Sequence, residues 1–355
     1  IREEVIDQVW QMILSFSGYS FCKPHSASYA LVSMKSAYLR AHYTSEFFAA
    51  VISNQGGFYS AFAYLSEAKR QGIRVLLPDV NESEIHYIGK DDWIRVGLMQ
   101  VKGLSGEGGK KIIEEREARG VFKDFEDFLA RLSLPPSELR LLVKGGCCDS
   151  IANNLSRPTM IWRIYERYGD GDELSLLSES SKNTPTPAEY DESIILKHEV
   201  ETLDMLVSRH PLDLYMVTDR GHSGSALKVP GSKGTTSFNP SIDLPFAPGT
   251  SKTDNFVWGK DLRKYIDKHV TMVGFLITGK TVYTKHDEPM EFVSFEDTTA
   301  IYETTFFPEA YKKFCHILVP GAKGRSTPFL LRGKVEANFG VPTLSVTFVE
   351  PLNNL

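Results

Sequence analysis

The sequence predicts a multidomain α+β protein, with helices in the first half and a small β-barrel at the end. Residues 1–71 and 97–168 carry apolar side chains at helical spacing, interrupted by glycine clusters. From about His269 onward, apolar and polar residues alternate with the period of β-strands. The chain has 355 residues, of which 42% are hydrophobic, so it can bury a core in each of two or three domains.

A basic, turn-forming segment over 18–26 leads directly into a predicted helix built on small residues. The apolar stripe of this helix keeps a period of 3.6 residues, and we expect that face to pack closely; it consists of Ala27, Ala30, Leu31, Met34, Ala37, Tyr38 and Ala41. Lys23 and His25 lie just ahead of the expected helix start, where free N–H groups and the helix dipole favour an anion such as a triphosphate. The plain alternative is a solvated lysine and a histidine that caps a turn.

Further helices follow from breaks in the apolar pattern. A second helix is centred on 47–51, and a third covers 61–70 and ends at Gly72 as a left-handed cap. Residues 74–77 are expected to be extended, and this segment ends at Pro78. Two more helical units lie between 97 and 151, and single helices are expected at 161–168 and 194–206. The Ser, Thr and Pro-rich segments 178–189 and 229–255 predict solvated loops.

Composition places limits on function without identifying it. The formal net charge is −5, so any binding of DNA must rely on local patches or backbone amides. The four cysteines form no C-x-x-C pair, which indicates a reducing, cytoplasmic setting. We expect no membrane segment, because no apolar run approaches the ~20 residues needed to cross a bilayer. The charged first residues do not fit a signal peptide, and a start at Ile1 is compatible with a fragment of a longer protein or with processing.

The segment 97–113 predicts two short helices joined by a glycine hairpin. Glycines let the backbone approach closely, so N–H groups at the start of the second helix can hold a DNA phosphate without reading bases. The candidate DNA-binding residues here are Gly103, Ser105, Gly106, Gly108, Lys110 and Lys111. A second hairpin at 143–149 adds Lys144 and Gly145. The alternative at both places is a glycine turn between packed helices.

The last part of the chain predicts strands at 270–276, 292–307, 329–335 and 344–348. Pro308 opens a short helix among them, and a helix in that place in a five-stranded barrel suggests an OB-fold, although periodicity does not exclude other small barrels. Lys280 and Arg325 are candidates for a groove that binds a single-stranded nucleic acid, and Phe292 or Tyr302 could stack on bases. Acidic neighbours nearly cancel this charge, and barrel aromatics more often lie in the core.

Several separate motifs together resemble one protein family. They are the lead and helix at 18–43, Glu46-Phe47, Gly72-Ile73-Arg74-Val75, Pro78-Asp79-Val80-Asn81, Arg95-Val96-Gly97-Leu98, Val101-Lys102-Gly103-Leu104 and Arg209-His210-Pro211. In this order they resemble the C-terminal portion of the alpha subunit of bacterial DNA polymerase III, a C-family polymerase. The resemblance implies four parts: the end of the fingers domain (1–90), a tandem helix-hairpin-helix domain (91–177), a connector (178–255) and an OB-fold domain (256–355).

The resemblance also implies an activity and partners. The parent enzyme would be a DNA-directed DNA polymerase, a nucleotidyltransferase of DNA replication, with Mg²⁺ bound outside this fragment and a deoxynucleoside triphosphate near Lys23 and His25. The hairpins would bind duplex product and the barrel template. The family has Gly where this chain has Ser105, so the first hairpin could be reshaped. An internal sliding-clamp peptide would lie at 173–177, with Leu174, Leu176 and Leu177 as its apolar residues, but its usual Gln and Phe are missing; an ordinary helix-end cluster is the alternative.

No complete active site is expected in this chain. The closely spaced palm carboxylates that hold divalent metals are absent, and Asp170-Gly171-Asp172-Glu173 fits a solvated loop. We therefore expect the fragment alone to bind DNA without extending it and to carry no cofactor. Residues 57–60 and the altered clamp peptide favour the error-prone branch over the replicative branch slightly. Two other classes stay open: a stand-alone nucleic-acid-binding accessory protein of DNA repair, and a purely structural interaction protein.

Overall fold

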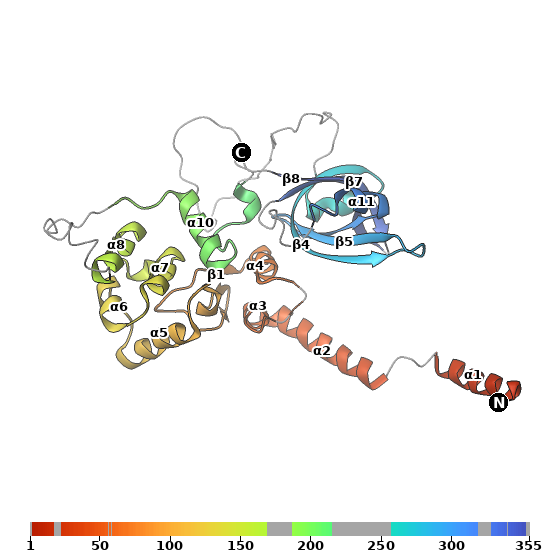
Figure 1. Ribbon diagram of the computed structural model, residues 1–355, viewed down its shortest axis with the longest axis horizontal. Coiled ribbons are helices and arrows are strands. Elements are labelled where there is room, and N and C mark those ends of the chain that lie inside the picture. Colours follow the sequence, from red (N-terminus) through yellow and green to blue (C-terminus); the bar gives the residue numbers. More distant parts are fainter. Residues whose placement is uncertain are drawn as a thin grey trace.

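The structure has a helical body and a closed β-barrel, each with its own hydrophobic core (Figure 1). It is a computed structural model that describes residues 2–17, 23–55, 57, 59–168, 187–214, 257–318, 328–338 and 340–352. This arrangement confirms the predicted multidomain α+β class. None of the helices in these ranges is long and apolar enough to cross a membrane.

The helical body begins with helices whose ends follow local capping chemistry. The helices that precede the barrel are α1 (Glu3–Ser17), α2 (Lys23–His42), α3 (Thr44–Ser53), α4 (Ala61–Arg70), α5 (Gly106–Arg119), α6 (Phe125–Arg131), α7 (Pro136–Lys144), α8 (Arg157–Tyr168) and α10 (Glu192–Leu203). The Ser60 hydroxyl accepts from the N–H of Ala63 at the start of α4. Gly72 follows its end with φ +85°, in the left-handed region, as predicted. α10 ends three residues earlier than expected, because Asp204 adopts a left-handed conformation.

Short elements complete this body. Three-residue strands β1 (Arg74–Leu76), β2 (Ile88–Lys90) and β3 (Trp93–Arg95) form a small sheet in the order β1-β3-β2. The 3₁₀ helices η1 (Leu98–Gln100), η2 (Asp149–Ile151) and η4 (Pro211–Leu214) lie in the connections. One hydrophobic cluster runs from Phe48 to Val207. The predicted division after residue 90 falls between the strands β2 and β3, which pair in this sheet.

The predicted packing face of α2 is exposed in this chain. Met34, at the middle of the expected apolar stripe, is 71% exposed, and Leu31 and Tyr38 are also open to solvent. Among the described residues, the C-terminal end of α2 is the part that meets the body, where the Arg40 side chain donates to Glu67 of α4. α2 therefore projects from the rest of the molecule (Figure 1). The expectation of close packing along this face is wrong for the described chain, because no described segment covers it.

The barrel has five strands that close on themselves. They are β4 (His269–Tyr283), β5 (Pro289–Glu296), β6 (Ile301–Phe306), β7 (Phe329–Asn338) and β8 (Val341–Pro351), in the order β4-β5-β6-β8-β7. β6 pairs with β8 in parallel and the other pairs are antiparallel. The helix α11 (Pro308–Phe314) lies between the third and fourth strands, and the 3₁₀ helix η5 (Gly259–Tyr265) precedes the first. This topology confirms the predicted OB-fold.

Candidate nucleic-acid interface

The first glycine hairpin lies on the surface and joins η1 to α5. Gly103 has φ +88°, and a Cβ atom at this position would lie 2.8 Å from Cδ1 of Leu141, so only glycine fits without strain. Gly103, Ser105 and Gly106 are exposed, whereas Gly108 is buried. The bend that the sequence predicted is therefore accessible to a large ligand.

Ser105 forms the N-cap of α5. Its hydroxyl accepts from the N–H of Gly108 at 2.9 Å, and its carbonyl accepts from the N–H of Gly109 at 3.0 Å. The N–H groups of Ser105, Gly106 and Glu107 have no hydrogen-bond partner among the described residues. These three donors lie at the N-terminus of a 14-residue helix, where the helix dipole adds positive potential.

Three lysines surround the hairpin, and two of them are paired with acids. Lys102 lies 3.7 Å from Asp204, and Lys111 lies 2.8 Å from Glu107, whose hydrogen bond raises the pKa of the lysine. Lys110 is exposed and has no partner among the described residues. Within the described chain, the site therefore combines backbone amides that have no partner with the unpaired side chain of Lys110.

A buried carboxylate, which the sequence analysis missed, lies behind the first turn of α5. A Cβ atom on Gly108 would approach Oε2 of Glu138 to 2.3 Å, so the glycine leaves room for this side chain. That oxygen has no hydrogen-bond partner among the described residues. The only sequence signal for Glu138 was its place in the first turn of α7, because acids are common there.

The second hairpin is covered by α10. Gly145 is buried, and a Cβ atom there would lie 3.2 Å from Oγ1 of Thr202. Lys144 forms an ion pair with Glu201 at 3.6 Å. The N–H groups of Gly145, Gly146 and Cys147 all donate to backbone carbonyls of α7. Within the described chain this segment has the geometry of the plain alternative, a glycine turn between packed helices.

The predicted nucleotide-binding residues lie in the first turn of α2. The helix begins at Lys23, so neither Lys23 nor His25 precedes it, and the expected placement ahead of the helix is corrected. His25 is exposed, and its ring packs edge-on against Tyr29 with centroids 4.5 Å apart. The structure describes the backbone of Lys23 but not its side chain. The described contacts do not bring His25 together with the hairpin.

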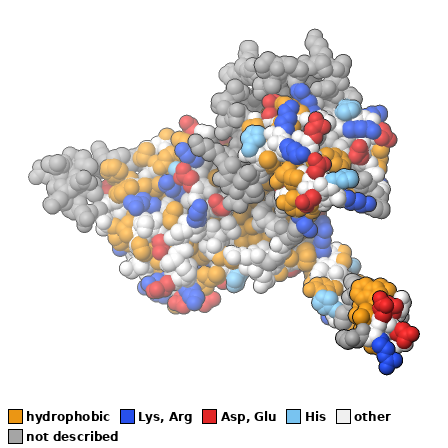
Figure 2. All heavy atoms as spheres, turned by 45° about the vertical axis from the view of Figure 1, so that its right-hand side comes forward, with side chains coloured by type: hydrophobic (Ala, Val, Ile, Leu, Met, Phe, Trp, Pro, Cys, Tyr) orange, Lys and Arg blue, Asp and Glu red, His pale blue; other side chains and the backbone are white. Residues whose placement is uncertain are grey.

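On the barrel, Lys280 and Phe292 are cross-strand neighbours of β4 and β5, and both are exposed. Tyr302 is only 4% exposed and stacks on Phe295 inside the barrel, so the hypothesis that it stacks on bases is wrong. Arg325 lies outside the described residues. Basic and acidic side chains are interspersed on the barrel surface visible in Figure 2, without a patch of one sign.

The predicted clamp peptide and the question of metal binding are the remaining points of the sequence analysis. The clamp-peptide residues Leu174, Leu176 and Leu177 lie in 169–186, outside the described ranges. In the described parts of the chain, no group of three or more His, Cys, Asp or Glu side chains could hold a metal ion. Cys147 and Cys148 are buried, and burial raises the pKa of both thiols, so they remain protonated.

Comparison with known families supports the hairpin assignment. Residues 72–159 match the family model described as a helix-hairpin-helix motif. This range contains η1, α5, α7 and both glycine hairpins. The predicted helix-hairpin-helix region is therefore confirmed as a motif.

Curated relatives extend over most of the chain. The DNA polymerase III subunit alpha of Saccharopolyspora erythraea is 28% identical over 99% of this chain and 29% of the relative. That of Thermus aquaticus is 34% identical over 61% of the chain and 18% of the relative. The error-prone DNA polymerase of Rhodopirellula baltica is 27% identical over 99% of the chain and 28% of the relative. The near-equal identities do not separate the replicative from the error-prone branch.

The predicted resemblance to the C-terminal portion of DNA polymerase III alpha subunits is thus confirmed. The chain spans less than a third of the length of these relatives. Among solved structures, a domain of replication protein A from Methanococcus maripaludis matches 28% of this chain and 97% of that domain, with 14% identity and a TM-score of 0.22.

Proposed function

We propose that this chain binds duplex DNA through the first hairpin, as the DNA-holding part of a polymerase of the DNA polymerase III alpha type. The observation that carries the proposal is the exposed turn at 103–107, where three N–H groups at the start of α5 have no partner in the described chain. Phosphate oxygens are the natural acceptors for such donors. Because phosphates are the same at every base pair, this contact would be independent of sequence.

The hairpin carries little free positive charge, and this limits the electrostatic contribution that we expect to DNA binding. Lys110 is the cation available to a phosphate, since Lys102 and Lys111 already have acidic partners. Backbone amides must therefore supply much of the interaction, which fits a chain with a net charge of −5. The covered second hairpin adds little to this surface, so we assign duplex contact to the first hairpin.

In a longer enzyme this region would support template-directed nucleotidyl transfer. The catalytic Mg²⁺ would be held by carboxylates outside this chain, and Lys23 and His25 would lie near the triphosphate of the incoming nucleotide. The barrel would contact single-stranded template at Lys280 and Phe292, in the cytoplasm and together with a sliding clamp and other replisome subunits. This chain alone would bind DNA without extending a primer.

Salt-dependent binding of labelled duplexes by the full chain tests the proposal. We expect Lys110→Glu to weaken binding about equally for two unrelated sequences, and to lower the slope of log K against log salt by about one. The loss arises because one phosphate contact is replaced by a repulsion. The readout is fluorescence anisotropy over a range of salt concentrations.

Lys123→Glu is the matched control. Lys123 is equally a surface lysine of the helical body, but it follows the far end of α5, a helix of 14 residues and thus about 20 Å long. Reversal of the charge of Lys123 should leave the affinity for duplex DNA nearly unchanged. Equal losses for Lys110→Glu and Lys123→Glu would indicate attraction by bulk charge, and no loss for Lys110→Glu would refute the role of the hairpin.

A further inference from the structure

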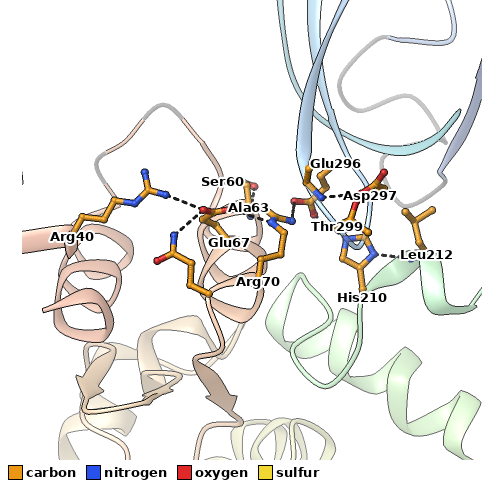
Figure 3. Close-up of polar contacts among 12 residues, drawn as sticks. Arg40, Ser60, Ala63, Glu67, Arg70, His210, Leu212, Glu296, Asp297 and Thr299 are labelled. Atoms are coloured by element: carbon orange, nitrogen blue, oxygen red, sulfur yellow. Dashed lines mark hydrogen bonds and ion pairs between the residues drawn. The ribbon is translucent and has the colours of Figure 1, made fainter. Parts of the chain in front are cut away.

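A fully buried carboxylate joins the barrel to the helical body. Glu296, at the end of β5, is 0% exposed. Its Oε2 accepts from Nη1 of Arg70 in α4 at 3.2 Å, and its Oε1 lies 3.3 Å from Nε2 of His210 (Figure 3). Nδ1 of His210 accepts from the N–H of Leu212, so Nε2 carries the hydrogen and donates to Glu296. Both partners of this barrel carboxylate therefore come from outside the barrel.

The two partners are themselves held in place. Nε of Arg70 donates to Glu67, whose other oxygen accepts from Arg40 of α2 (Figure 3). His210 follows a turn in which one oxygen of Glu199 accepts from the N–H groups of Val207 and Ser208. These contacts hold the guanidinium and the imidazole in position at the interface.

Apolar side chains surround the ionic contact. Phe62 of α4 packs edge-on against Phe275 of β4, with ring centroids 5.4 Å apart, and its ring is tilted against that of His210 at 5.9 Å. Phe275 is the cross-strand partner of Glu296. Leu212 is buried against the barrel, in a cluster with Val273 and Leu330. The ionic contact is thus part of a packed interface.

This interface covers part of a face that matters in OB-folds. β5 and β6 are the second and third strands of the barrel, and OB-folds use the face of these strands to bind oligonucleotides. Along the outward side of β5, exposure falls from 45% at Phe292 to 5% at Ser294 and 0% at Glu296. Ser294 donates to the carboxylate of Glu303 on β6. The docked half of the face is therefore acidic, and its outward residues on these two strands include no lysine or arginine.

We infer that the Glu296 half of the β5–β6 face is a protein-docking surface for α4 and the 207–212 turn, and not an oligonucleotide surface. Burial of a carboxylate is tolerated only with partners of this kind, so loss of Arg70 leaves a charge that drives the two parts to separate. The exposed acidic surface would then repel a polyanion. This inference does not depend on the role of the glycine hairpin.

Distances between spin labels in the full chain test the docking. Labels introduced through an unnatural amino acid at the exposed positions Ala118 of α5 and Asp287 of the β4–β5 turn report the separation of the two parts. We expect one narrow distance distribution for the native chain. Phe62→Ala combined with Arg70→Ala should broaden it severalfold and lengthen it. Both changes lie on α4, so the barrel fold remains intact.

Glu336→Gln is the control, because Glu336 is an outward glutamate of the barrel that contacts Ser345 within it. Its distance distribution should match that of the native chain. An unchanged distribution in the Phe62, Arg70 double variant would overturn the docking role. Binding of oligo-dT by the same double variant gives the second readout. We expect no gain in affinity, and a gain of fivefold or more would show that α4 masks an oligonucleotide surface instead.

Discussion

At the residue scale, single side chains in this chain have roles that their sequence neighbours do not reveal. Arg70, His210 and Glu296 meet only in the folded molecule, so spacing along the chain could not connect them. Tyr302 is different, since it has the same strand parity as the inward residues Thr304 and Phe306. The period-two pattern could therefore have placed Tyr302 inside the barrel.

His198 gives a pH prediction at this scale. It lies on α10 with its ring edge-on to Tyr190, and its Nδ1 has no hydrogen-bond partner among the described residues. Burial and then the nearby Lys144 lower the pKa of His198 below its ordinary value of 6.5. As pH falls below 6.5, the unfolded chain takes up a proton before the folded chain does. The folded state therefore loses stability down to the lowered pKa.

The measurement is urea unfolding of native protein and of His198→Gln between pH 7.5 and pH 5. We expect the free energy of unfolding to fall less steeply in the variant, by at most about 1.4 kcal/mol per pH unit, the limit for one proton. Other titrating groups contribute equally to both proteins, so the difference isolates His198. Parallel pH profiles would contradict the prediction.

At the scale of elements, helix caps and glycines determine which helices and strands the sequence predicts. α4 was predicted correctly, because Ser60 and Gly72 mark its two ends. β2 and β3 were not predicted, since strands of three residues are too short to show a period. The first helix of the hairpin is also only the three-residue η1, and the positive φ of Gly103 carries the turn instead.

We therefore expect Gly103 and Gly106 of the hairpin to differ in how well they tolerate a side chain. Gly103→Ala should destabilise the chain by about 1–2 kcal/mol, because an alanine there is left-handed and meets Leu141. Gly106 is helical with nothing near its missing Cβ, so Gly106→Ala should change stability by only a few tenths of a kcal/mol.

Duplex affinity should follow the same order, because Gly103→Ala displaces the free N–H groups that follow it, whereas Gly106→Ala keeps them. The two variants differ by one methyl group each and are measured side by side by urea unfolding and anisotropy. Equal affinities in the folded proteins would show that the turn geometry does not position the amides for phosphate.

At the scale of the whole molecule, local composition does not predict the extent of the helical body. The Ser, Thr and Pro-rich segments suggested boundaries within 178–255, and the described barrel core begins at Val257. The first core instead runs from Phe48 to Val207, because α10 returns to pack on the hairpins. The N–H of Lys102 donates to the carbonyl of Thr202 at 2.7 Å, which ties the two together. Such returns depend on tertiary contacts that local patterns do not contain.

The two separate hydrophobic cores of the described chain predict two unfolding transitions. Phe128 lies in the helical core and Phe295 in the barrel core, and both are 0% exposed. Each change to alanine should destabilise its own part by roughly 3–5 kcal/mol through lost contacts and a cavity. Hydrogen exchange followed by mass spectrometry along a urea series assigns each transition to its peptides.

Phe128→Ala should shift the transition of peptides from α5 to α8, and Phe295→Ala that of peptides from β4 to β8. Among the described residues, Arg70 couples the two parts through its ion pair with Glu296, so Arg70→Ala should make the two transitions more independent. A single shared transition that moves with either phenylalanine, and that persists in Arg70→Ala, would show that the helical body and the barrel fold as one cooperative unit.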